Sequence, residues 1–116
     1  MKHLVLSFCF LFCFVHASHS QQLKFVEDTA AMKKNILDII PVGTPIDRAK
    51  AILLRNKMEY EGDYKQEEFM YGGLLDFLFF YHDEGMIISM DRWKVALVYK
   101  SGKVSDVQVQ FVIIGL

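Results

Sequence analysis

An excess of charge of either sign is missing from this chain, and that absence excludes one class of partner. The 13 Lys and Arg residues are nearly balanced by 14 Asp and Glu residues, and the formal net charge is −1. Binding to nucleic acid requires a concentrated Lys and Arg surface that contacts phosphates, and no basic cluster occurs in the sequence. We therefore exclude nucleic acid as a partner.

Cysteine and histidine are also scarce, and their positions limit the chemistry that the chain can perform. Both cysteines, Cys9 and Cys13, and three of the four histidines lie within residues 1–20. The rest of the chain has no thiol nucleophile and only one imidazole, that of His82. No His-x-x-x-His pair and no carboxylate-rich metal loop is present in the sequence. The sequence therefore predicts a protein that is not an enzyme and that binds no metal ion or other cofactor.

The chain also lacks an apolar run long enough to cross a membrane, which requires roughly 20 residues. Its run Leu4–Val15 is shorter, follows the basic residue Lys2 and precedes a small, polar stretch, HASHSQQ. This order is typical of a secretory signal peptide. We predict that residues 1–20 are cleaved, that residues 21–116 form a single α+β domain without a transmembrane span, and that the protein is exported, either periplasmic or secreted. Cleavage after Ala17 and an uncleaved membrane anchor are the alternatives.

The first half of the predicted domain has helical periodicity. Between Gln22 and Ile40, apolar residues recur at the spacing of one helix face, namely at Met32, Ile36, Ile39 and Ile40. A second helix is predicted to begin at residues 44–47, where Thr44 caps the free amides and Pro45 occupies the first helical position. We expect this helix to end near Asn56.

From Met58 onward the hydrophobic period changes to two, as in β-strands. The predicted strands are Met58–Tyr64, Leu74–His82 in a central position, a returning strand at 86–90, and strands at 93–100 and 104–114. The predicted connections are a loop at 65–73, a turn at 83–85 and a hairpin turn at Ser101-Gly102. Whether Met86–Lys100 is one bent strand or two stays open. The predicted fold class is α+β, with two N-terminal helices packed on one face of a three- to four-stranded antiparallel sheet.

Two features of the second half indicate a binding surface. Alternation places Glu59, Glu61 and Asp63 on one face of a strand, as the rim of a docking surface or as a charged edge that discourages aggregation. The aromatic side chains are too numerous for a sheet covered on one side, so some lie on the open face unless a partner, a second copy or a long loop covers them. The candidate partner-binding anchors are Tyr60, Tyr64, Trp93 and Tyr99.

Two motifs carry a resemblance to known exported domains. The segment IPVGTP at 40–45 opens a short helix, and Trp93–Val104 has the hairpin pattern W-x-V-x-L-x-Y-x-x-G-K-V. Over roughly Ile36–Val109 the chain therefore resembles small exported bacterial domains of the BamE/SmpA type and β-lactamase-inhibitor-protein-like modules, and more closely a group of uncharacterised bacterial secreted proteins with the same hairpin.

The resemblance implies a fold and a mode of binding. These families pair two helices with a three- or four-stranded antiparallel sheet, and the inhibitor-like modules dock onto an enzyme through the open face of that sheet. BamE is a lipoprotein subunit of the outer-membrane β-barrel assembly machine. This chain has no lipobox, because phenylalanine precedes both Cys9 and Cys13.

These observations predict a non-enzymatic exported protein-interaction module that binds another protein and that could also form a homodimer. One alternative is a secreted inhibitor or immunity-type protein that binds a single target enzyme. A more remote alternative is a small metal-binding protein or enzyme centred on His82, because His82-Asp83-Glu84 offers three ligand types in succession.

Overall fold

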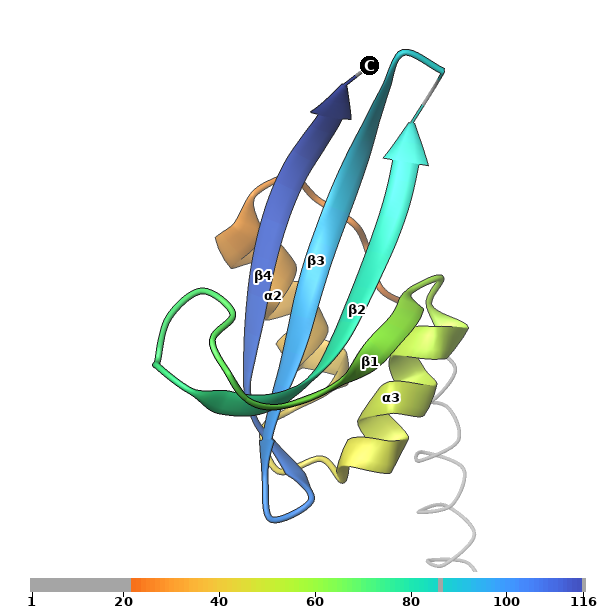
Figure 1. Cartoon of the computed structure of the whole chain (residues 1–116). Helices are drawn as coiled ribbons and strands as arrows, with labels where there is room; N and C mark the ends of the chain where they lie inside the picture. Colours follow the sequence, from red (N-terminus) through yellow and green to blue (C-terminus); the bar gives the residue numbers. More distant parts are fainter. Residues whose placement is uncertain (1–21, 86, 116) are drawn as a thin grey trace, which may run out of the picture.

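The computed structural model describes residues 22–85 and 87–115, which form two helices and a four-stranded antiparallel sheet (Figure 1). The strands follow one another in the sheet in chain order, β1-β2-β3-β4. This arrangement confirms the predicted α+β class, whereas the predicted signal peptide lies outside the described residues. The elements are α2 (Thr29–Ile39), α3 (Ile46–Arg55), β1 (Glu59–Glu67), β2 (Leu75–Gly85), β3 (Ser89–Lys100) and β4 (Lys103–Gly115).

The strand boundaries correct two of the predictions. The predicted turn at 83–85 is wrong, because Asp83 and Glu84 pair with β3 and β2 continues to Gly85. The predicted loop at 65–73 is too long, because β1 extends to Glu67. The strand β3 is continuous from Ser89, which settles the question of one strand or two.

Two turns explain why β2, β3 and β4 pair over such a length. Ser101 and Gly102 have φ values of 53° and 74° between the paired residues Lys100 and Lys103, as expected for a type I′ hairpin turn, and this prediction is confirmed. Gly85 has φ 150°, and a Cβ atom there would lie 2.6 Å from the Ser89 carbonyl oxygen. Only glycine can therefore begin the β2–β3 connection in this conformation.

The helix α2 begins later than its hydrophobic pattern suggests. Asp28 is the N-cap residue, and its Oδ1 accepts from the backbone N–H groups of Ala30 and Ala31. Residues 22–28 form an extended segment that reaches across to the sheet, where the carbonyl oxygen of Val26 accepts a 2.7 Å hydrogen bond from Trp93 Nε1. The helical part of the predicted segment is thus confirmed only from Thr29.

The start of α3 uses a tertiary contact in place of the predicted Thr44 cap. Thr44 Oγ1 donates to the carbonyl oxygen of Pro41 at 2.6 Å, and no side chain caps the helix. The N–H of Ile46, the first helical residue, donates to the carbonyl oxygen of Gly102 in the β3–β4 turn at 2.9 Å. The capping prediction is wrong because the hairpin turn already satisfies that amide.

The main core lies between the helices and one face of the sheet, which we call the covered face. Met32 and Ile36 of α2 and Leu53 of α3 are fully buried against Phe80 of β2 and its neighbours on β3 and β4. The largest contributions from the strands are Leu78, Phe80, Trp93, Val95, Leu97, Val107 and Val109. These residues alternate along each strand, so that the other face, the open face, carries the residues between them.

A second, smaller cluster covers half of the open face. Phe77, Ala96 and Val98 are buried there beneath Phe69 of the β1–β2 loop. Gln108, which is also buried, fastens this loop: its Oε1 accepts from the N–H groups of Met70 and Tyr71, and its Nε2 donates to the Tyr71 carbonyl oxygen at 2.8 Å. The loop thus covers some of the aromatic side chains that, from the sequence, were expected to lie on the open face.

Candidate functional site

The four predicted anchors do not form one surface. Trp93 is 3% exposed and packs among Phe25, His82 and Phe111 on the covered face. Its indole N–H donates to the carbonyl oxygen of Val26. The side chain is therefore part of the core. The prediction that Trp93 lies on the open face is therefore wrong, because the extended segment at 22–28 covers it.

Tyr60 and Tyr99 also lie on the covered face, at its margin. Lys50 of α3 lies over the Tyr60 ring at 3.8 Å from its centroid, and Tyr60 contacts Phe80. Tyr99 packs against the main core and its hydroxyl bonds to Asp63 and Lys65. Tyr64 alone faces the other side, where it stacks on Phe77 with the ring centroids 5.3 Å apart.

The acidic row of β1 is divided between the two faces. Glu59 pairs with Tyr81 and Asp63 with Leu78, but the register shifts between Tyr60 and Gly62 and leaves Glu61 without a partner on β2. A β-bulge of this kind reverses the alternation of side chains. As a result Glu59 accepts from the Tyr81 hydroxyl on the open face, whereas Asp63 accepts from Tyr99 on the covered face. The prediction that Glu59, Glu61 and Asp63 share a face is wrong.

His82 is 8% exposed and both of its ring nitrogens are occupied. Nδ1 lies 2.9 Å from the carbonyl oxygen of Lys57, and Nε2 lies 2.8 Å from Glu84 Oε2. Both neighbouring oxygen atoms are hydrogen-bond acceptors. The ring also stacks on Phe25 at 3.8 Å. This arrangement leaves neither nitrogen free to bind a metal ion or to act as a base.

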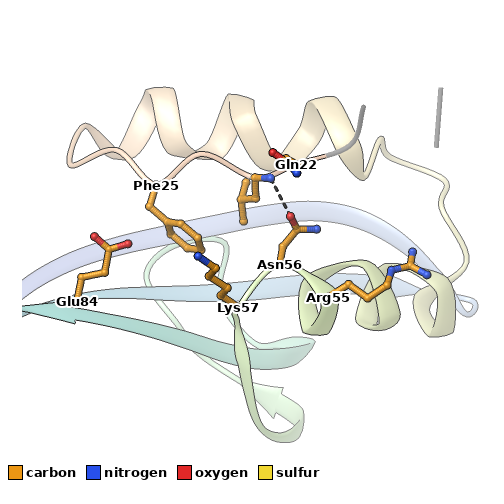
Figure 2. Close-up of a pocket in the computed structure, with 7 residues that line it drawn as sticks. Gln22, Phe25, Arg55, Asn56, Lys57 and Glu84 are labelled. Carbon is orange, nitrogen blue, oxygen red and sulfur yellow. Dashed lines mark hydrogen bonds between the residues drawn. The ribbon is translucent and has the colours of Figure 1, made fainter. Parts of the chain in front are cut away.

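A pocket of about 250 Å³ lies beside His82, between the extended segment and the end of α3 (Figure 2). The amide of Asn56 is used internally, because Oδ1 accepts from the Leu23 N–H and Nδ2 donates to the Ile52 carbonyl oxygen. Glu84 is already bonded to His82. No buried polar group is therefore held ready for a ligand there. The lining residues are Gln22, Leu23, Phe25, Arg55, Asn56, Lys57 and Glu84.

The open face beyond the β1–β2 loop carries a network of charged and aromatic groups. Arg92 donates two hydrogen bonds to Asp83, at 2.7 and 2.8 Å, and its guanidinium lies 4.8 Å from the centroid of the Tyr81 ring. The bonds from Arg92 lower the pKa of the Asp83 carboxyl, and the bond from Tyr81 to Glu59 raises the pKa of the Tyr81 hydroxyl. This network links β2 to β3 on the open face, in addition to the backbone ladder between the two strands.

The ends of β2, β3 and β4 extend beyond the helices, and we call this part of the sheet the distal arm, residues 83–85, 87–92 and 110–115 (Figure 1). Four isoleucines are exposed near its end, where Ser89 pairs with Gly115 and Met90 pairs with Ile114, and Ile113 and Ile114 belong to opposite faces of the sheet because successive strand residues alternate. Their exposed fractions are 90% for Ile87, 77% for Ile88, 65% for Ile113 and 37% for Ile114. The sequence analysis missed these residues, although an Ile-Ile pair beside a turn was a visible signal.

Comparisons with known proteins add no relative: no family model, no curated protein and no solved structure matches the chain. The resemblance to BamE/SmpA-type and inhibitor-like modules therefore stays a prediction. Within the described residues, no group of three or more His, Cys, Asp or Glu side chains is placed to hold a metal ion. Neither α2 nor α3 has the length and apolarity needed to cross a bilayer.

Proposed function

We propose that the protein is a non-enzymatic, exported interaction module that binds another protein through the distal arm. The observation that carries this proposal is the isoleucine group at the end of the arm. Ile87 and Ile88 are mostly exposed, whereas apolar residues in the middle of the same sheet, such as Phe80 and Val95, are completely buried. Clustered exposed aliphatic side chains are typical of surfaces that a partner covers.

The surroundings of the isoleucines favour a protein as the partner. The open face behind them presents Tyr81 and the Arg92–Asp83 pair, and aromatic and Arg side chains are enriched at protein interfaces. The predicted signal peptide supports export, because a secreted or periplasmic module would meet its partner outside the cytoplasm. The resemblance to modules that dock through an open sheet supports the same conclusion.

The experiment is capture of a partner from an envelope extract by the chain that begins at Gln21, which contains every element described above. The test variant carries Ile87→Ser and Ile88→Ser, and the matched control carries Val42→Ser and Leu54→Ser, two exposed positions away from the arm. We expect the first variant to lose the captured protein and the second to retain it. Equal capture by both variants would exclude the arm as the binding surface.

A second candidate function is inhibition of a single enzyme. It is favoured by the projecting β2–β3 connection, which could enter a concave active site as a flat surface could not (Figure 1). Addition of the pure protein to enzymes captured in the first experiment distinguishes the two functions. Loss of activity that depends on Ile87 and Ile88 indicates an inhibitor, whereas unchanged activity indicates a module that only binds.

A further inference from the structure

The two edges of the sheet are protected to very different degrees. The edge strand β1 is interrupted by register shifts and carries Glu59, Glu61, Asp63 and Glu67. Bulges and charges of this kind prevent an edge from pairing with another strand. The opposite edge strand, β4, has no proline, and between Val107 and Gly115 it has no charged residue.

Among the residues that the structure describes, backbone bonds to other segments cover only the first part of the β4 edge. The segment before α3 bonds to Val104, with Gly43 N–H donating to its carbonyl oxygen at 2.8 Å and Val104 N–H donating to Thr44 at 2.9 Å. Next along the strand, Lys33 Nζ of α2 contacts Asp106 at 3.2 Å and the Tyr71 hydroxyl at 2.9 Å. Because the Tyr71 backbone bonds to Gln108 on the open face, the loop passes around the edge at this point (Figure 1).

We call the contacts of Lys33 with Asp106 and Tyr71 the clasp. Beyond the clasp, the pairing of β4 with β3 is regular. From Asp106 to Gly115 every residue of β4 has a consecutive partner on β3, without a register shift. In the described residues, the backbone bonds from the outer side of β4 to other segments are those near Val104. Val107–Gly115 therefore offers an uncharged, regularly paired row of backbone groups roughly 30 Å long, at about 3.3 Å per residue.

We propose that a second copy of the chain occupies this edge, with the two β4 strands antiparallel about a two-fold axis near Phe111. An uncharged strand is compatible with its own copy, whereas the acidic edge of β1 would repel its copy. The clasp at Asp106 limits the overlap at both ends, so Val107–Gly115 of one copy matches Gly115–Val107 of the other. The result is a continuous eight-stranded sheet in which the two arms point in opposite directions, so that Gly115 at the end of each arm lies beside Val107 of the other copy.

This inference goes beyond the proposed function, because the β2–β3 ends and the open face of both copies stay accessible to a partner. The first test is the mass in solution of the chain from Gln21, measured by light scattering. We expect a dimer. The variant designed to prevent the dimer carries Gln110→Glu and Val112→Glu. Within one copy these residues pair with Lys94 and Arg92, but in the dimer they place four carboxylates together across the axis. We expect this variant to be a folded monomer with an unchanged circular dichroism spectrum.

The control variant, Ile87→Glu with Ile88→Glu, adds the same charge at the end of the arm and should remain a dimer. It separates the two proposals, since it should lose the partner but not the second copy. The variants Gln110→Cys and Val112→Cys then test the axis, because residue 110 of one copy lies opposite residue 112 of the other. A mixture of the two variants should therefore cross-link on oxidation more efficiently than either variant alone. A monomer at micromolar concentration, or cross-linking that does not depend on position, would overturn the inference.

Discussion

The two halves of the sheet differ in what covers them, and this difference separates stability from binding. Around Leu78 and Val98 the sheet has the helices on one face and the β1–β2 loop on the other. In the distal arm, strands of the same sheet are held by their ladder and by surface pairs such as Arg92–Asp83. Burial on both faces provides most of the stabilisation, so the arm can expose isoleucines without unfolding the domain.

The boundary between the halves lies where the extended segment crosses the sheet. Phe25 stacks on His82 and contacts Trp93, which joins residues distant in sequence into one aromatic group. Among the described residues, the main core contains no residue of β2 beyond Phe80. The following substitutions test whether the two halves differ as this arrangement requires.

The largest effect is expected from Trp93→Ala. It removes a buried ring and leaves the Val26 carbonyl oxygen without its donor, so it should lower the free energy of unfolding by about 3–5 kcal/mol. Urea denaturation followed by circular dichroism measures the change. The control Trp93→Phe, which retains an aromatic ring but not the N–H, should cost clearly less. A loss below about 1 kcal/mol for the alanine variant would show that Trp93 is not a core residue.

An intermediate effect is expected from Gln108→Ala on the half-covered open face. The variant loses the acceptor of the Met70 and Tyr71 N–H groups and the donor to Tyr71, and it should cost about 1–3 kcal/mol. The loop at 68–74 should also become sensitive to proteases. The control is Gln110→Ala, because Gln110 lies two residues further along β4 on the same face and makes no such hydrogen bonds to the loop. Unchanged proteolysis of the Gln108 variant would mean that Phe69 and the Lys33–Tyr71 contact are sufficient to hold the loop.

A smaller, pH-dependent effect is expected from Asp83→Asn in the arm. Arg92 lowers the pKa of the Asp83 carboxyl in the folded state, so the stabilisation is present above the unfolded pKa of about 4 and is lost as the pH falls through the folded pKa. The substitution should cost at most about 1 kcal/mol at pH 7, because the pair is partly exposed. The difference from the unmodified protein should vanish near pH 2. A difference that stays constant from pH 7 to pH 2 would contradict this role of the ion pair.

The smallest effect on stability is expected from Ile87→Ser with Ile88→Ser. Both side chains are mostly exposed, so the free energy of unfolding should change by no more than about 0.5 kcal/mol. Thermal denaturation at matched protein concentration measures the change. A loss of several kcal/mol would mean that the isoleucines stabilise the fold, and the separation between the two halves would fail.

The elements of the fold could be predicted from local pattern, but their boundaries depended on contacts. The period of Met32 and Ile36 indicates a helix, and Ser101-Gly102 is a turn signal that needs no tertiary information. Thr44 has the residue type of a cap, but its helix start lies against the β3–β4 turn, which satisfies the first amide. The pattern of β2 predicts a strand, but only its partner β3 determines that it continues to Gly85.

The candidate site was harder to predict, because the face of the sheet on which a side chain lies depends on the strand register. Alternation would place Glu59, Glu61 and Asp63 together, and a single unpaired residue in the ladder separates them. Trp93 was a reasonable anchor by residue type, yet the extended segment buries it. The Ile87-Ile88 pair was visible in the sequence, but only the pairing of Ser89 with Gly115 places Ile113 and Ile114 at the same end of the sheet.

Sequence by itself determined the α+β class, the helix and strand periods and the hairpin turn, because these follow from the local spacing of apolar residues and from glycine conformations. The tertiary structure alone decided which face each side chain occupies, which edge is protected and which apolar residues stay exposed. Those outcomes depend on strand register, on one bulge and on a loop that folds over the sheet, and such contacts join residues far apart in the chain.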